Sequence, residues 1–165
     1  LPGDAIEAFR SILKTDPAYP VDIADNLAAD PGEGTVEPHL ETIDRVFAHD
    51  TMEAIVAALE AEGTEWAGKQ LSILRTKSPQ SLKVTLRQLR IGRGLGSFAE
   101  NMAMEYALGG RVVRTHDFQE GVRSVILDKD NTPNWKPARL EEVTDAELDR
   151  LFAPLPGGKV WRPIG

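Results

Sequence analysis

Residues 116–137 have the sequence HDFQEGVRSVILDKDNTPNWKP, and they predict a helix followed by a stiff extended segment. Asp117 and Glu120 have the D-x-x-E spacing of a reciprocal helix-capping pair. Apolar residues then recur at helical spacing: Val122, Val125 and Ile126. We therefore expect a helix over residues 117–128 with an apolar stripe.

Two further features of this segment predict close packing. Gly121 lies in the first turn of the expected helix, where glycine costs about 1 kcal/mol of helix propensity relative to alanine. We therefore expect a neighbour to pack closely against it. Pro133 and Pro137 prevent further helix, and Trp135 between them is expected to anchor the extended segment by packing.

The segment resembles the C-terminal signature of the 3-hydroxyisobutyryl-CoA hydrolases, a branch of the enoyl-CoA hydratase/isomerase (crotonase) superfamily. Similar blocks occur at residues 77–89 (KSPQSLKVTLRQL), 104–106 (MEY) and 142–152 (EVTDAELDRLF). The resemblance is strong over roughly residues 40–153 and weak over residues 1–39.

The resemblance implies that this chain is the C-terminal helical part of a longer enzyme. In that superfamily an N-terminal α/β core supplies two backbone N–H groups for the thioester oxyanion and acidic side chains for acid–base chemistry. No segment here matches those motifs, so we expect no catalytic residue and no activity in this chain alone. Its helices would cap the core and complete the acyl-CoA pocket or an oligomer interface. The intact enzyme would hydrolyse a short 3-hydroxyacyl-CoA thioester in valine breakdown.

Lys129 is the one candidate for binding coenzyme A. The resemblance implies that basic residues just after this helix can reach the phosphates of coenzyme A, and Lys129 has that position. Asp128 precedes it, where many hydratases carry a basic residue. The alternative is an exposed lysine that the helix dipole favours at a C-terminus. Coenzyme A would be part of the substrate, and no separate cofactor is expected.

Composition and charge limit the other classes of function. The 165 residues include no cysteine, which excludes disulfides, thiolate metal sites and a cysteine nucleophile. No run of 18 apolar residues and no signal peptide is visible, so we expect a cytoplasmic protein, or a mitochondrial matrix protein in a eukaryote. Residues 1–65 have a net charge of −12 and residues 66–136 a net charge of +6. The basic part could pair with the acidic part or face a phosphate-bearing ligand.

Other motifs predict structure rather than chemistry. The glycine cluster at residues 92–96 lacks the spacing of a phosphate-binding loop and predicts a turn between helices. Residues 66–99 hold seven basic side chains and no acid. No aromatic residue lies between Trp66 and Phe98 to stack on bases, so nucleic-acid binding is not expected. The histidines lack metal-ligand spacing, so no metal site is expected: His39, His49 and His116.

The chain as a whole predicts an all-α fold of about eight helices. Residues 1–153 would form a single helical domain or fragment, and residues 154–165 a loose C-terminal tail. Helix-start signals include Asp50 with Glu53, Ser78 before Pro79, and Thr144 with Glu147. Helical patterns cover residues 5–13, 21–29, 39–48, 51–61, a segment from 64, 79–91, 97–114, 117–128 and 144–152.

Two alternatives to the hydrolase stay open. The parent enzyme could be an enoyl-CoA hydratase or isomerase, although the ending Trp135-Lys136-Pro137 and the SLKVTLRQL helix favour the hydrolase branch. The chain could instead be a non-catalytic helical interaction module. A capping part should expose apolar surface and self-associate, whereas a module should be a well-behaved monomer. The expected partners are the acyl-CoA substrate, the N-terminal core and a second copy of the chain, with no nucleic acid and no membrane.

Overall fold

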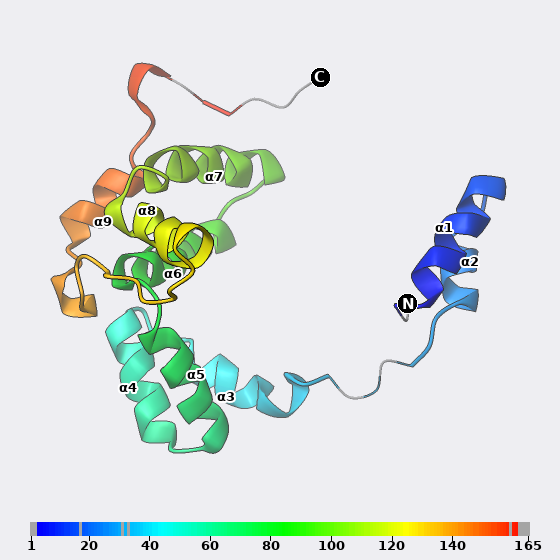
Figure 1. The fold of residues 1–165 in the computed structure, drawn as a ribbon, viewed down its shortest axis with the longest axis horizontal. Coiled ribbons are helices and arrows are strands. Elements are labelled where there is room, and N and C mark those ends of the chain that lie inside the picture. Colours follow the sequence, from blue (N-terminus) through cyan, green and yellow to red (C-terminus); the bar gives the residue numbers. More distant parts are fainter. Residues whose placement is uncertain (1–2, 17, 31, 33, 159, 162–165) are drawn as a thin grey trace. The chain divides into compact units, whose positions relative to one another are not determined.

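The computed structural model describes residues 3–16, 18–30, 32, 34–158, 160 and 161 (Figure 1). These described residues form helices, turns and loops without a strand, which confirms the predicted all-α class. Their contacts group them into two compact units, residues 1–44 and residues 45–165, where the sequence predicts one domain over residues 1–153.

The N-terminal unit contains two short helices that contact each other, α1 (Ala5–Thr15) and α2 (Pro20–Asn26). Pro20 lies in the first turn of α2, where a backbone N–H would have no partner within the helix. Neither helix contains a buried residue, and Ile6 is 47% exposed. The helices predicted over residues 5–13 and 21–29 are therefore present, but they bury little apolar surface.

The first hydrophobic core of the C-terminal unit surrounds α4 (Met52–Glu62) and α5 (Glu65–Arg75). The two helices pack side by side and are joined at Gly63, whose φ of 64° is the left-handed conformation that glycine adopts readily (Figure 1). The helix predicted over residues 39–48 begins as η1 (Glu37–His39) and continues as α3 (Leu40–Val46). The buried members of this core are Val46, Met52, Ile55, Leu59, Ala67 and Leu71.

Threonine side chains cap α4 and α5. The Oγ1 atoms of Thr51 and Thr64 each accept a hydrogen bond of 3.2 Å from the backbone N–H three residues later. The start of α5 is as predicted, but the capping role predicted for Asp50 and Glu53 is wrong. Thr51 has the extended backbone of a capping residue, and the carboxylate of Glu53 lies 2.6 Å from Nζ of Lys83 instead.

The second core lies between α6 (Pro79–Arg93), α7 (Phe98–Val112) and α9 (Asp145–Phe152). The helix starts at Ser78 and at Thr144 are confirmed, the latter as a full capping box with Glu147. The glycine cluster at residues 92–96 spans the turn between α6 and α7, as predicted. The buried members of this core are Val84, Leu108, Val143, Leu148 and Leu151.

Basic side chains from residues 66–99 hold the helices of this unit together. Lys83 pairs with Glu53 on α4, and Arg87 pairs with Asp149 on α9 at 2.7 Å. Arg75 on α5 also pairs with Glu60 on α4, and Arg90 donates to the carbonyl groups of residues 47–49, whereas Lys69 pairs with Glu65 within α5. Pairing within the unit therefore accounts for most of the basic stretch that the sequence shows.

The remaining elements connect α7 to α9 and continue beyond it. They are α8 (His116–Val122), the π-helical turn η2 (Arg123–Leu127), η3 (Leu140–Glu142) and η4 (Pro156–Gly158). Arg111 on α7 donates from Nε to the carbonyl oxygen of Ala153 at 3.0 Å and also donates to that of Pro154. The start of the predicted loose tail is thus held against α7, whereas residues 159 and 162–165 lie outside the described residues.

Candidate functional site

The capping residue of the signature helix lies two positions before the one that the sequence predicts. Thr115 has an extended backbone, and its Oγ1 accepts a hydrogen bond from the N–H of Phe118, so Thr115 caps α8. The capping role predicted for Asp117 and Glu120 is therefore wrong. Thr115 and Asp117 are both residue types that cap helices. Thr115 forms the cap, because the carboxylate of Asp117 binds partners elsewhere in the chain.

Asp117 is buried and joins three parts of the chain. Only 3% of the residue is exposed, and its carboxylate accepts hydrogen bonds from the Ser78 hydroxyl and, at 2.8 Å, from the backbone N–H of Lys136. Ser78 Oγ also accepts a hydrogen bond from the Ser81 N–H as the cap of α6. A single carboxylate thus fixes the start of α6, α8 and the returning extended segment.

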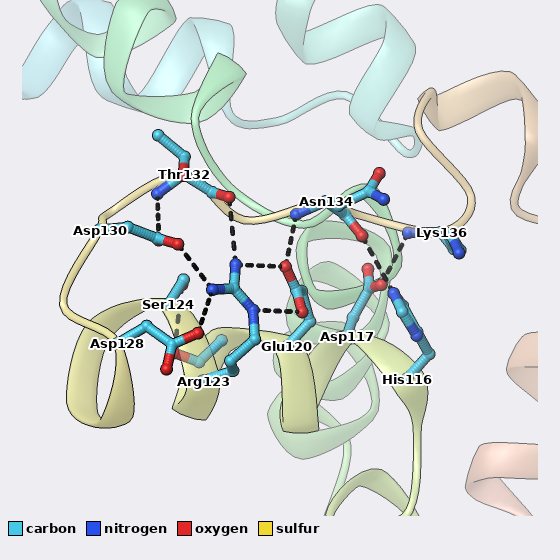
Figure 2. A network of polar contacts seen from close by, with 11 residues as sticks. His116, Asp117, Glu120, Arg123, Ser124, Asp128, Asp130, Thr132, Asn134 and Lys136 are labelled. Carbon is cyan, nitrogen blue, oxygen red and sulfur yellow. Dashed lines mark hydrogen bonds and ion pairs between the residues drawn. The ribbon is translucent and has the colours of Figure 1, made fainter.

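Arg123 is the centre of a network of acidic side chains (Figure 2). Its guanidinium donates to both oxygens of Glu120, at 2.8 and 3.0 Å, which is the bidentate geometry that arginine forms with carboxylates. It also donates to Asp128 at 2.7 Å and to Asp130 at 2.6 Å. The carbonyl oxygen of Thr132 accepts a further bond at 3.3 Å. This one side chain therefore closes the loop that follows the helix.

The network shifts the titration of its members. The Arg123 guanidinium, together with the N–H of Asn134, lowers the pKa of Glu120 from 4.5 to about 2. Hydrogen bonds to Glu120, Asp130 and Asp128 raise the pKa of Arg123. The hydrogen bond from Arg123 also lowers the pKa of Asp130. These shifts keep Glu120, Arg123 and Asp130 in their charged forms at neutral pH, so that they attract one another and hold the loop.

The end of the helix presents apolar side chains to solvent. The π-helical turn widens the backbone, so that the N–H of Asp128 bonds to the carbonyl oxygen of Arg123 at 2.8 Å and Ser124 is fully buried. Val125, Ile126 and Leu127 are instead 59%, 62% and 70% exposed, and we call these three residues the apolar ridge. Of the predicted apolar stripe, Val122 is half-buried, whereas Val125 and Ile126 lie in the wider turn and point to the surface.

Trp135 packs against the helix at the predicted glycine. A Cβ atom built on Gly121 would lie 3.5 Å from the indole ring of Trp135, so the glycine is where the ring approaches the backbone. The indole Nε1 donates to the carbonyl oxygen of Thr76 at 3.1 Å, just before α6. The roles predicted for Gly121 and for Trp135 as a packing anchor are confirmed.

A model of the enoyl-CoA hydratase/isomerase family matches residues 4–152 of the chain. The chain belongs to this family. Among curated members, the mitochondrial 3-hydroxyisobutyryl-CoA hydrolase of Gallus gallus is 47% identical over 74% of this chain and 32% of its own length. The Bos taurus protein of the same name is 39% identical over 93% of this chain and 36% of its own length. The chain thus spans about a third of these relatives.

Solved structures of the family share the fold of this chain. The match to a carnitinyl-CoA dehydratase from Mycobacterium thermoresistibile covers 93% of this chain and 44% of the dehydratase chain, with 32% identity and a TM-score of 0.84. The match to an enoyl-CoA hydratase from Rhodobacter sphaeroides covers 93% of this chain and 48% of the hydratase chain, with 34% identity and a TM-score of 0.74. The family that the signature residues predicted is confirmed.

Lys129, the residue predicted to reach coenzyme A in this family member, lies on the exposed surface just after the π-helical turn. Its φ of 56° is left-handed, which is uncommon for a residue other than glycine. Asp128 and Asp130 on either side are both bonded to Arg123, so the backbone that carries Lys129 is held at two points. The role of Lys129 in binding coenzyme A stays a prediction.

The structure adds residues that sequence reasoning missed. The D-x-x-E spacing drew attention to capping, but the signal for the network was an arginine followed within seven residues by two aspartates. His116 lies with Nε2 3.0 Å from the carbonyl oxygen of Asn134.

Within the described part of the chain, no group of three or more metal-ligating side chains comes together. No helix there is long and apolar enough to cross a membrane.

Proposed function

We propose that this chain is the C-terminal helical part of a 3-hydroxyisobutyryl-CoA hydrolase, which cleaves a short 3-hydroxyacyl-CoA thioester to the free acid and coenzyme A. The observation that carries the proposal is the 39–47% identity to proteins of that name over at least 117 residues. The oxyanion-binding and acid–base groups would belong to the rest of the enzyme.

The geometry of the signature segment favours a structural role for this chain in the proposed enzyme. Four charged side chains of the Arg123 network bind one another, so they are occupied in fixing the loop. The loop in turn holds the apolar ridge and Lys129 at the surface. In the proposed enzyme the rest of the protein covers the ridge, and Lys129 meets the phosphates of coenzyme A.

A second candidate function is that of an enoyl-CoA hydratase. Two solved structures that resemble the chain carry the names of a carnitinyl-CoA dehydratase and an enoyl-CoA hydratase. The curated relatives favour the hydrolase, because they match at higher identity. By analogy with those relatives we propose the mitochondrial matrix as the location in a eukaryote, and the cytoplasm in a bacterium.

A chimeric enzyme tests the proposal. The region of the Bos taurus hydrolase that matches this chain is replaced by this chain, and thiol release from 3-hydroxyisobutyryl-CoA is compared with water addition to crotonyl-CoA. We expect thiol release from the first substrate and little reaction with the second. A folded chimera that releases no thiol would mean that this chain does not complete the active site of a hydrolase core, and would favour the hydratase.

A substitution in the chimera tests the role of Lys129. We expect Lys129→Gln to raise KM for 3-hydroxyisobutyryl-CoA several-fold with kcat unchanged, because a contact to the remote phosphates stabilises substrate and transition state equally. The pantetheine thioester of the same acid lacks those nucleotide phosphates and serves as the control. If its KM rises as much as that of the CoA thioester, Lys129 does not act through the phosphates.

A further inference from the structure

A pocket next to the second core, lined by residues of α7, α9 and the segments that follow them, has a chemistry that the proposed function does not use. Its volume is about 630 Å³, which is within the range of small-molecule sites. Side chains from α7, α9 and the segment after α9 form its walls. The lining residues are Tyr106, Gly110, Arg111, Arg114, Arg150, Leu151, Leu155 and Pro156.

The charged residues among those that line the pocket are all arginines. Arg111 comes from the last turn of α7, Arg114 from the turn that follows this helix, and Arg150 from α9. No carboxylate is among the lining residues. Arg150 contributes to lowering the pKa of nearby Glu147, after the larger effect of hydrogen bonds from Thr144. The lining therefore presents three guanidinium groups to any ligand.

The arginines differ in how they are held. Arg111 is half-buried and donates to the carbonyl oxygens of Ala153 and Pro154, so its guanidinium is fixed in the wall. Arg114 and Arg150 are exposed at the surface, and Arg114 also donates to the carbonyl of Gly110. A guanidinium group can bind two oxygens of one phosphate group. Several guanidinium groups in one pocket therefore suit a ligand with more than one phosphate.

The other walls are apolar or aromatic. Leu151 is buried in the second core, and Leu155 packs so closely on Gly110 that a Cβ atom there would lie 3.2 Å from the leucine side chain. Tyr106, 45% exposed, adds an aromatic ring to the lining. A bare inorganic anion would leave these surfaces without a contact, whereas an organic phosphate would cover them.

We propose that this pocket binds a nucleotide diphosphate group, with the phosphates at the three arginines and the organic part against Tyr106 and the leucines. The site is separate in sequence from Lys129 and is built on α7 and α9 rather than on the signature loop. The proposal does not depend on thioester hydrolysis, because binding is measured without turnover.

Calorimetric titration of the protein with ADP tests the proposal, with adenosine as the control for the organic part alone. We expect ADP to bind at one saturable site and adenosine not to bind. Arg150→Gln should weaken ADP at least about tenfold, the effect of losing one charge-assisted contact. Arg93→Gln, at the end of α6 and outside the pocket lining, should leave affinity unchanged.

Arg114→Gln provides a second variant that leaves the Arg111 wall contacts in place, and circular dichroism verifies that both variants fold. Absence of saturable ADP binding would overturn the proposal, as would equal affinity in Arg150→Gln and Arg93→Gln. Competition between coenzyme A and ADP would identify the nucleotide end of an acyl-CoA as the ligand. ADP binding without competition would identify a free nucleotide.

Discussion

At the scale of single residues, Arg123 decides how the signature segment folds. It holds Glu120, Asp128 and Asp130 around one guanidinium, and these carboxylates would repel one another without it. We expect Arg123→Met to lower the Tm by several degrees and to increase amide hydrogen exchange over residues 128–134. Arg10→Met removes an exposed pair with Glu7 and should change Tm little. Equal effects of the two variants would contradict a central role for Arg123.

The pH dependence of this network has a definite sign. The pKa of Glu120 is lowered from 4.5 to about 2 in the folded protein, so its contribution to stability is fully present above pH 4.5. That contribution is lost as the pH falls from about 4.5 to about 2. The difference in Tm between the protein and Glu120→Gln should therefore shrink across this range. A difference that stays constant down to pH 2 would show that Glu120 titrates normally.

Two glycines that look alike in sequence should respond oppositely to alanine. Gly121 has space for a Cβ in ordinary contact with Trp135, so Gly121→Ala should stabilise the protein by up to about 1 kcal/mol through helix propensity. Gly63 has a φ of 64°, so Gly63→Ala should destabilise it by about 1 kcal/mol. Urea unfolding of both variants measures this, and a loss of stability in Gly121→Ala would mean that the indole cannot accommodate the methyl group.

At the scale of helices, the buried hydrogen bond between Asp117 and Ser78 joins α8 to the start of α6. Asp117→Ala should cost about 2 kcal/mol, because it leaves the Ser78 hydroxyl and the Lys136 N–H without their acceptor. Since the two residues share one bond, the double variant with Ser78→Ala should cost less than the sum of the single variants. Denaturant unfolding of the three variants measures the coupling, and strict additivity would exclude it.

Local sequence signals were sufficient for most helix boundaries. Ser78 before Pro79 and Thr144 with Glu147 fix their helix starts within a few residues, so the sequence alone identifies them. The role of Asp117 could not be predicted from local sequence, because its partners Ser78 and Lys136 are 39 and 19 residues away. The π-helical turn was not predictable either, because Ser124 at its buried centre is not an apolar residue. Sequence periodicity identified the apolar stripe of Val125 and Ile126 but not that both side chains lie at the surface.

At the scale of the whole molecule, the apolar ridge is the feature that a covering partner would explain. The Phe98 and Leu89 side chains are also 75% and 67% exposed, so the ridge is not the only exposed apolar surface among the described residues. We expect the isolated chain to bind a hydrophobic dye and to self-associate in analytical ultracentrifugation. The double variant Val125→Ser, Ile126→Ser should reduce dye binding and self-association with little change in Tm. If the unchanged chain is a monomer that binds no dye, an independent module is favoured instead.

The family could be recognised from the sequence, because residues 77–89 and 116–137 hold long ordered motifs that the comparisons confirm. The arginine-lined pocket could not, because Arg111 and Arg150 are 39 positions apart and meet only through the packing of α7 on α9. The signature places Lys129 at the exposed surface, and its role in binding coenzyme A stays a prediction.

Thiol release from 3-hydroxyisobutyryl-CoA by this chain alone, at high concentration, tests most directly whether catalysis lies outside it. We predict no release above that of buffer, because the charged groups of the signature loop are bound to one another. Steady turnover would contradict this. The acid and base would then have to lie among Glu100, Glu105, Asp117, Glu120 and Asp128.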